Sequence, residues 1–276
     1  MNKLIQYREG YFKGVRKVRL FYRHWKIAEP TAVVVRVHGF GSHGGRSKHV
    51  AEFLLEKGLN FSSYDQRGHG KSEGMRGYVD AFQEFLDDLH RFVKLSRIED
   101  TPTFLLGSSL GGLISLLYSI KNSRAIEGVI ASAPFLKIGS DVTLSSQDIG
   151  EIQKIAVVYP TAFFNFGDAE EVRSRKEEDE LMHDTMTFKL FSEILWAQKK
   201  VFDFGRFITV PSLLLHGSAD TIADPAGSRE LFDRIANADK KLIIYKSMKH
   251  VLLGNDREAM PVLMDIVNWM NDHIKT

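Results

Sequence analysis

Residues 104–112 read FLLGSSLGG and contain the most informative motif of the chain. An apolar run ends in small residues, and a helical apolar pattern over 110–120 follows without a break. The sequence therefore predicts a strand over 103–106, a sharp turn and a helix. Glycine at positions 107 and 111 gives the strand and the helix room to approach closely. The pattern Gly-x-Ser-x-Gly places Ser109 at the tip of the turn, with its hydroxyl clear of the sheet.

Alternating strand and helix patterns continue on both sides of this turn. Predicted strands cover residues 32–37, 59–64, 128–133, 212–215 and 242–245, after an antiparallel pair within 11–26. Predicted helices begin near Val50 and cover 81–97, 225–235 and 257–274, and Asp80 is the expected N-cap of the helix at 81–97. This alternation predicts an α/β fold with a mostly parallel central sheet and helices on both faces.

The alternation stops between Pro134 and Pro211. A connection this long must have its own structure, and its apolar spacing is helical. Two apolar stripes indicate helices, the first at Ile149, Ile152, Ala156 and Tyr159 and the second at Phe188, Phe191, Leu195 and Trp196. We therefore expect a helical cap, or lid, at 135–207, inserted late into an α/β core formed by 1–134 and 208–276. The charged run 170–180 is expected to be solvated.

The composition excludes several classes of function. The net charge is +2 and the basic residues are scattered, so no concentrated basic face for nucleic acid is expected. The absence of cysteine excludes disulfides and thiolate metal sites, and we expect neither a metal nor a cofactor. No apolar run is suited to a signal peptide or a membrane span, which indicates a cytoplasmic protein. Peripheral contact of the cap with membrane or micelles stays open, as does the oligomeric state.

Two later segments carry the partners that a nucleophilic serine needs. A histidine must take the hydroxyl proton, and an acid must orient that histidine. Asp220 follows one apolar strand in a polar turn, and His250 follows the next strand. Asp224 is the competing acid, but the proline directly after it is typical of a helix N-cap. The order serine, acid, histidine therefore predicts a catalytic triad of Ser109, Asp220 and His250.

The loop HGFG at 38–41 follows the buried strand at 32–37. A backbone N–H in this position pairs with the N–H just after a nucleophilic serine to bind an oxyanion. The donors expected here are the N–H groups of Phe40 and Leu110. Two such donors stabilise the negative charge that develops on the reacting oxygen during acyl transfer.

The same loop supports a rival hypothesis. Gly39, Gly41 and Gly44 match the dinucleotide fingerprint, and Asp65 ends the next strand, where a ribose-binding acid belongs. The fingerprint should follow the first strand of its unit, whereas an antiparallel pair precedes this one. The hypothesis also leaves the serine, acid and histidine unexplained, so a dinucleotide-binding protein is the remote alternative.

These motifs resemble the monoacylglycerol lipase and lysophospholipase branch of the α/β-hydrolases over nearly the whole chain. The resemblance is carried by HGFG at 38–41 with Arg46, DQRGHGKSEG at 65–74, GSSLGG at 107–112, GSAD at 217–220 and KHVL at 249–252. It implies a carboxylic ester hydrolase that works through an acyl-enzyme, with Ser109 as nucleophile, Asp220 as acid and His250 as base. It also implies a small lipid-like ester substrate whose acyl chain lies in an apolar channel under the cap. Candidate substrate-binding residues are Arg46, Tyr159, Phe163, Phe164 and Leu195.

The chain departs from the family pattern around the expected head-group site. Ser42 stands where the family loop often has glutamate, and Ser47 stands where it often has tyrosine. Leu253 stands where a second histidine often follows the catalytic one. In some members the glutamate and that histidine help to hold a glycerol head group. The resemblance therefore does not fix the head group of the substrate.

Two other activities on the same fold stay open, a peptidase or amidase and a broad carboxylesterase. Peptidases need an acidic anchor for a free N-terminus, and the cap carries acidic residues at Glu170, Glu171 and 177–180. A binding module without catalysis is a third hypothesis. The complete set of serine, acid and histidine argues against it.

Overall fold

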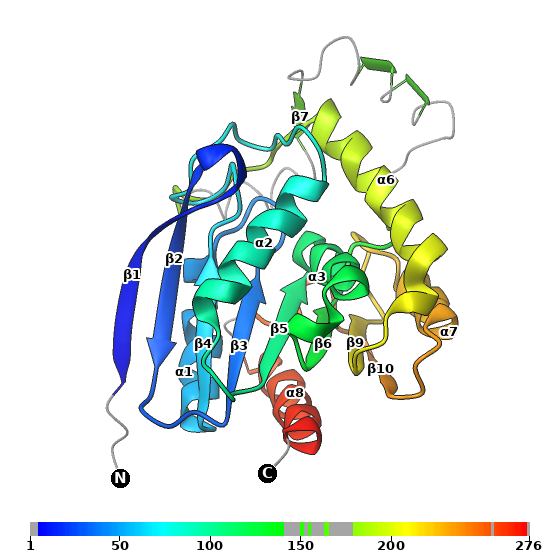
Figure 1. Cartoon of the computed structure of the whole chain (residues 1–276). Coiled ribbons are helices and arrows are strands. Elements are labelled where there is room, and N and C mark those ends of the chain that lie inside the picture. The colour runs from blue at the N-terminus through cyan, green and yellow to red at the C-terminus, as the bar shows by residue number, and fades with distance from the viewer. Residues whose placement is uncertain are drawn as a thin grey trace.

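An eight-stranded sheet lies at the centre of the molecule (Figure 1). The structure is a computed structural model that describes residues 5–140, 150–151, 154–155, 179–254 and 257–274, and the backbone of 163–165. In spatial order the strands are β1 (Gln6–Lys13), β2 (Arg19–Lys26), β4 (Leu59–Tyr64), β3 (Ala32–Val37), β5 (Thr103–Ser108), β6 (Gly128–Ser132), β9 (Ser212–Gly217) and β10 (Lys240–Tyr245). β2 runs antiparallel to β1 and β4, and the other pairs are parallel. The predicted mostly parallel α/β fold is confirmed.

Helices cover both faces of the sheet, as predicted. α1 (Lys48–Glu56) and α8 (Ala259–His273) pack on one face, and α2 (Gln83–Ser96), α3 (Leu110–Lys121), α6 (Phe188–Phe204) and α7 (Pro225–Arg234) pack on the other. Short 3₁₀ helices lie at Val15–Lys17, Gly44–Ser47, Ser123–Ala125 and Gly205–Phe207. Figure 1 shows α2, α3 and α6 in sequence across the near face. Within the described residues, none of the helices combines the length and the apolar content that crossing a membrane requires.

The strand β3 shows why a central strand is apolar along most of its length. Its side chains alternate between the two core clusters, with Val33, Val35 and Val37 on the α2–α3 side and Ala32 and Val34 on the α1–α8 side. Each valine that leaves water contributes about 1.5–3 kcal/mol of stability. The same alternation turns Arg36 toward the α1 side, where it is only 6% exposed. A charged side chain therefore occupies a core-facing position of this strand.

The segment between β6 and β9 is helical in part. α6 begins at Phe188 because the Thr187 hydroxyl caps it, accepting a hydrogen bond from the Leu190 N–H at 3.1 Å. The short strands β7 (Phe163–Asn165) and β8 (Thr185–Thr187) pair antiparallel, which the apolar spacing did not predict. Trp196, placed in the second apolar stripe, is 47% exposed. The first stripe lies outside the described residues, and the cap boundaries at 135 and 207 stay a prediction.

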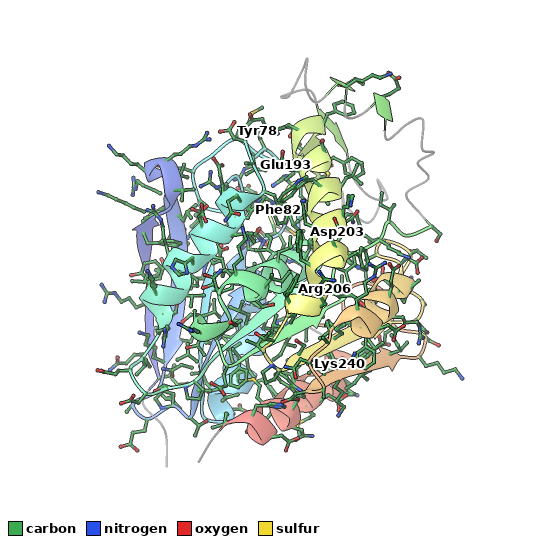
Figure 2. All side chains as sticks on the ribbon, turned by 45° about the vertical axis from the view of Figure 1, so that its right-hand side comes forward. Tyr78, Phe82, Glu193, Asp203, Arg206 and Lys240 are labelled. Atoms are coloured by element: carbon green, nitrogen blue, oxygen red, sulfur yellow. The ribbon has the colours of Figure 1, made fainter. Side chains whose placement is uncertain are left out.

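The start of α2 differs from the sequence prediction. The helix begins at Gln83, and Asp80 does not cap it. The Asp80 carboxylate instead accepts a hydrogen bond from the Tyr78 hydroxyl at 2.6 Å and pairs with Arg16. The N–H of Phe82 donates to Glu193 of α6 at 2.8 Å, and Figure 2 shows these two side chains close together. A carboxylate 111 residues away in the sequence thus takes the role expected of Asp80.

Buried histidines make the fold sensitive to acid. His24 on β2 is 4% exposed, and its Nδ1 lies 2.7 Å from the Ser62 hydroxyl. Burial, together with the nearby Lys26 and Arg8, lowers the pKa of His24 to about 4. A histidine in the unfolded chain has a pKa near 6.5. Between these two values the unfolded state binds more protons than the folded state, so stability falls as the pH falls through this window.

We expect His24→Gln to flatten the pH dependence of the unfolding free energy between about pH 4.5 and 6. The slope should fall by about 1 kcal/mol per pH unit, because one titrating histidine contributes at most about 1.4 kcal/mol per unit. Urea unfolding of both proteins at several pH values measures the slope. An unchanged slope would show that His24 titrates alike in the folded and unfolded states.

Candidate active site

Ser109 lies on a tight and strained turn. Its backbone has φ 54° and ψ −121°, between the end of β5 and the start of α3. A positive φ is unfavourable for a residue with a side chain, so the surroundings must hold it. The Ser109 carbonyl accepts hydrogen bonds from the N–H groups of Gly112 and Leu113 at 2.9 and 3.1 Å. A Cβ on Gly111 would collide with the carbonyl oxygen of Val37, so only glycine fits there.

The structure brings Ser109, His250 and Asp220 into one line of hydrogen bonds. His250 Nε2 lies 2.9 Å from Ser109 Oγ, and His250 Nδ1 lies 2.7 Å from Asp220 Oδ2. The three residues come from the β5–α3 turn, the β10–α8 loop and the β9–α7 turn, at the carboxyl ends of parallel strands. Because a carboxylate only accepts, Nδ1 must carry the imidazole proton. Nε2 is then ready to accept the serine proton.

Asp220 is a buried carboxylate with several donors around it. Its Oδ1 accepts from the N–H groups of Ile222 and Ala223 at 3.0 and 2.9 Å. Its Oδ2 accepts from both His216 and His250. Burial alone would raise the pKa of Asp220, but the hydrogen bonds from the two imidazoles outweigh it and lower the pKa well below its ordinary value. Asp220 therefore stays ionised opposite His250.

The competing acid, Asp224, has the structural role that its sequence context predicts. Its carboxylate accepts a hydrogen bond from the Ala226 N–H at 2.8 Å, and Pro225 stands in the first turn of α7. This is N-cap geometry, which satisfies one of the free N–H groups at the start of the helix. The predicted capping role of Asp224 is confirmed.

His216 is a second histidine on Asp220, and the sequence did not predict it. It is fully buried at the end of β9. Its Nε2 lies 3.0 Å from both Asp220 Oδ2 and the Ala223 carbonyl, and its Nδ1 lies 2.7 Å from the Ser228 hydroxyl. Both partners of Nε2 accept, so Nε2 carries the proton and Nδ1 accepts from Ser228. His216 thus donates a hydrogen bond to the same Asp220 oxygen that accepts the hydrogen bond from His250 Nδ1–H. The available signal was a histidine at a strand end, four residues before the acid.

The loop after β3 is held close to Ser109. A Cβ on Gly39 would lie 3.2 Å from the Cβ of Ser109. His38 fixes this loop, because its Nδ1–H donates to the Gly39 carbonyl at 2.7 Å and its Nε2 accepts the Gln66 N–H at 2.9 Å. Burial lowers the pKa of His38 to about 3. The ring therefore stays neutral near pH 7, and these two hydrogen bonds keep their directions.

Phe40 and Leu110, the predicted oxyanion donors, both lie near Ser109. Phe40 lines the same pocket as Ser109, and Leu110 is the first residue of α3. N–H groups in the first turn of a helix have no partner within the helix, and the helix dipole favours negative charge there. The Phe40 ring packs edge-on against His69 and His183, with centroids 5.8 and 5.3 Å away. These contacts anchor the loop that carries the Phe40 N–H.

The predicted substrate-binding residues fall in different places. Arg46 lines the pocket beside Ser109, and its Nη1 lies 3.4 Å from Asp179 Oδ2. Leu195 is partly buried against the core cluster on the α3 side. Tyr159 lies outside the described residues. Phe163 and Phe164 belong to β7, of which only the backbone is described.

A pocket of about 250 Å³ opens beside Ser109. Its walls are formed by the loop 38–40, the segment around Arg46, the turn at 108–109, Met182 and the loop 250–254. Ser109 and His250 both face it, so it offers a substrate direct access to the reacting groups. Among the described residues that line this pocket, none is acidic.

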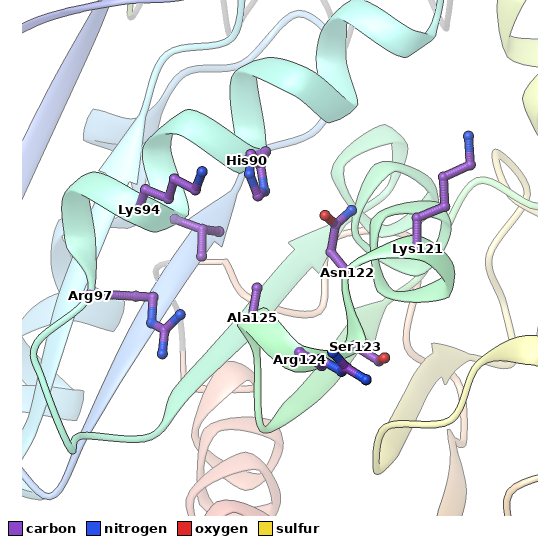
Figure 3. Close-up of a pocket in the computed structure, with 9 residues that line it drawn as sticks. His90, Lys94, Arg97, Lys121, Asn122, Ser123, Arg124 and Ala125 are labelled. Carbon is purple, nitrogen blue, oxygen red and sulfur yellow. The ribbon is translucent and has the colours of Figure 1, made fainter.

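A larger hollow, of about 460 Å³, lies between α2 and the segment after α3 (Figure 3). Its lining includes Lys94, Arg97, Lys121 and Arg124. Most of these cations stand at the C-terminal ends of helices, where they complement the helix dipole. In Figure 3 the Lys121 side chain points away from that of Arg97, so the cations do not converge on one bound group. The residues around Ser109 do not contribute to this hollow.

The structure does not support the dinucleotide hypothesis. Asp65, the residue assigned to a ribose, is fully buried. Its Oδ1 accepts from Arg23 at 2.7 Å and from the Gly44 N–H at 2.8 Å, and its Oδ2 accepts from the Lys71 N–H at 2.9 Å. Burial alone would raise the pKa of Asp65, but Arg23 keeps it below its ordinary value. In the described part of the chain, no three His, Asp or Glu side chains gather as metal ligands.

Serine hydrolases of the α/β-hydrolase fold carry the nucleophile on a strand–turn–helix element, with an acid and a histidine from later loops. The fold and the site place this chain in that class. Its sequence matches the Hydrolase_4 family, described as serine aminopeptidase S33, over residues 28–258. The chain belongs to this family.

Similar proteins indicate which kind of bond this class of hydrolase cleaves. The chain is 29% identical over 275 residues to the monoacylglycerol lipase of Mycolicibacterium smegmatis, which covers 96% of this chain and 98% of that protein. It is 30% identical over 266 residues to the monoglyceride lipase of Rattus norvegicus, with 92% and 88% covered. The crystal structure of Paleococcus ferrophilus monoacylglycerol lipase superposes with a TM-score of 0.80 at 27% identity, covering 97% of this chain and 99% of that one. The chain is a carboxylic ester hydrolase.

We expect His216→Leu to lower kcat/KM for an ester about tenfold or more, because a hydrogen bond to a charged group contributes roughly 1.5–3 kcal/mol. His216→Gln should retain most of the activity, since its amide N–H can still donate to Asp220. Steady-state kinetics of the two variants, with thermal unfolding as a control for the fold, measures the difference. Equal activities in two equally stable variants would show that His216 does not act through Asp220.

Proposed function

We propose that the chain hydrolyses the ester bond of monoacylglycerols and related lysophospholipids through an acyl-enzyme intermediate. The observation that carries this proposal is the line of hydrogen bonds from Ser109 through His250 to Asp220, beside an open pocket. Monoacylglycerol lipases among the relatives support the acylglycerol part. The phospholipase YtpA of Bacillus subtilis, 26% identical over 244 residues, supports the lysophospholipid part.

In the proposed acylation step, His250 Nε2 takes the hydroxyl proton while Ser109 Oγ attacks the ester carbonyl carbon. The carbonyl oxygen becomes an oxyanion, which the N–H groups of Phe40 and Leu110 stabilise by roughly 3–4 kcal/mol each. Asp220 stabilises the imidazolium that forms. The bond between the carbonyl carbon and the alcohol oxygen then breaks, and the imidazolium gives its proton to the departing alcohol.

Deacylation repeats the same steps with water. His250 takes a proton from water, and the hydroxide attacks the acyl carbon on Ser109. When the intermediate collapses, the proton on His250 returns to the serine oxygen and the fatty acid leaves. Because Asp220 stays ionised and holds the Nδ1–H of His250, one imidazole tautomer serves both half-reactions.

The acyl chain has a proposed place under the cap. We assign the cap to residues 135–207 and the acyl channel to its apolar side chains, including Tyr159, Phe163 and Phe164. Leu195 packs into the core cluster, so its part in the proposal is to support the channel wall. The contact of α6 with α3 supports a cap whose C-terminal helix is fixed on the core.

Exposed aromatic residues on α6 and on the short 3₁₀ helix after it support peripheral contact with lipid. Trp196, Phe204 and Phe207 are 47%, 42% and 46% exposed. Lys200 lies over the rings of Trp196 and Phe204, and Arg206 lies over that of Phe207. Aromatic and basic side chains on one surface suit the boundary of an anionic membrane, and flotation with lipid vesicles measures this contact.

An aminopeptidase is the second candidate, because the matched family carries that description. Its anchor for a free N-terminus would come from the acidic residues at 170–180. Most of these residues lie outside the described part of the chain. Asp179, which is described, already accepts from His43 at 2.7 Å and pairs with Arg46.

We expect p-nitrophenyl esters and monoacylglycerols to be turned over with a higher kcat/KM than aminoacyl anilides, with a preference for medium or long acyl chains. Ser109→Ala should abolish turnover while its circular dichroism spectrum stays that of the wild type, because only the nucleophile is lost. Steady-state rates on the three substrate series decide the matter. A preference for the anilides would overturn the ester assignment in favour of the peptidase.

A further inference from the structure

The pocket beside Ser109 has a definite place in the reaction, given the proposed function on which this inference rests. His250 returns its proton to the alcohol, so the alcohol part of the ester must lie on the His250 side of Ser109. The loop 250–254 that follows His250 forms one wall of the pocket. The pocket is therefore the space next to the departing alcohol.

Arg36 gives this pocket an unusual charge. It lines the pocket from β3 and is 6% exposed. Its Nε donates to the Ser47 hydroxyl at 3.3 Å, and its Nη1 donates to the carbonyls of Val37 and Leu106 at 3.2 and 3.1 Å. Within the described residues, Nη2 has no hydrogen-bond partner. Because Arg36 lines the pocket and its Nη2 makes none of these hydrogen bonds, the N–H groups of Nη2 can donate to a ligand there.

The other buried arginines of the described chain all have acidic partners. Arg23 pairs with Asp65 at 2.7 Å, and Arg67 pairs with Asp88 at 2.7 Å and also with Glu84. Arg36 pairs with no carboxylate in the part of the chain that the structure describes, and burial lowers its pKa to about 10. A buried ion without an opposite charge is unfavourable. An anionic ligand would supply the missing charge.

The other described residues that line the pocket also favour an anionic ligand. Arg46 lines it as a second cation, and its acidic partner Asp179 is shared with His43. The described lining contains no acidic side chain. At position 42, where the family loop often has glutamate, the chain has serine. The described lining therefore offers Arg36 no carboxylate, and the one that pairs with Arg46 lies outside the lining and is shared with His43.

We propose that this pocket binds an anionic group, phosphate or carboxylate, carried by the alcohol part of the ester. Arg36 Nη2 is the principal donor and Arg46 a second cation. A guanidinium that presents two N–H groups suits the paired oxygens of either anion. The enzyme accordingly prefers an acylated alcohol bearing an acidic group, such as an acyl glycerol phosphate, over an uncharged monoacylglycerol.

Butanoyl esters of glycerol 3-phosphate, glyceric acid and glycerol test the proposal, since they share an acyl group and stay below micelle formation. We expect kcat/KM to be about tenfold or more higher for at least one charged ester than for the glycerol ester. Comparison of the ester that carries a phosphate with the ester that carries a carboxylate shows which anion the pocket binds. Equal values for charged and neutral esters would overturn the inference but leave the proposed function intact, whereas turnover of no ester would sink the proposed function itself.

Substitution of Arg36 distinguishes a role in binding the anionic group from a role in holding the fold together. Arg36→Met should bring the ratio of kcat/KM for the preferred charged ester to that for the glycerol ester near unity, and Arg36→Lys should restore part of it. The control is Arg124→Met, which replaces an exposed arginine in the short 3₁₀ helix after α3 and should keep the wild-type ratio. If Arg36 only joins the ends of β3 and β5, Arg36→Met lowers both rates alike and the ratio is unchanged, which contradicts the proposal.

Competition on the wild-type chain gives a second readout that needs no variant. Glycerol 3-phosphate should inhibit hydrolysis of butanoyl glycerol competitively, with an inhibition constant about tenfold or more below that of glycerol. Glycerate, which carries a carboxylate in place of the phosphate, is tested as an inhibitor in the same way. If neither glycerol 3-phosphate nor glycerate inhibits at a lower concentration than glycerol does, the proposal is wrong.

Discussion

The architecture depends on the close contact of β5, α3 and the end of β3 around Ser109. A Cβ on Gly107 or on Gly111 would collide with the backbone of neighbouring segments. This crowding holds Ser109 at φ 54°, a conformation that costs on the order of 1–3 kcal/mol for a residue with a side chain. Packing of the sheet and its helices must offset that cost. In this arrangement the Ser109 hydroxyl lies at the N-terminus of α3, and the loop 38–41 lies beside it.

The two buried charges near this turn are stabilised in different ways. Asp220 accepts from two imidazoles and two backbone N–H groups, so its negative charge is well compensated. Its shared oxygen links His216, which is held by Ser228, to His250, which faces the serine. Arg36 has only carbonyls and a hydroxyl as partners among the described residues. Asp220 is therefore compensated within the protein, whereas the proposed role of Arg36 is to bind an anionic group of the substrate.

The sequence predicted those features that depend on local patterns. Strands buried on both faces and helices with apolar stripes gave the α/β alternation, and the chain order of serine, acid and histidine pointed to residues that the structure places in hydrogen-bond contact. The prediction that Asp80 caps α2 was wrong, because the N-terminus of α2 is bound by Glu193, from a helix far along the chain. The β7–β8 pair and the contact of His216 with Asp220 were missed for a related reason. Strand pairing and side-chain hydrogen bonds depend on geometry that neither composition nor spacing expresses.

The central claim is that Ser109 is the activated nucleophile. An organophosphorus fluoridate reacts with a serine whose hydroxyl is activated by a histidine, and peptide mass spectrometry locates the bound phosphoryl group. We predict a single adduct, on Ser109, and loss of that adduct in a folded His250→Ala variant. An adduct on Ser108 or another serine, or no adduct in a correctly folded wild-type chain, would contradict it.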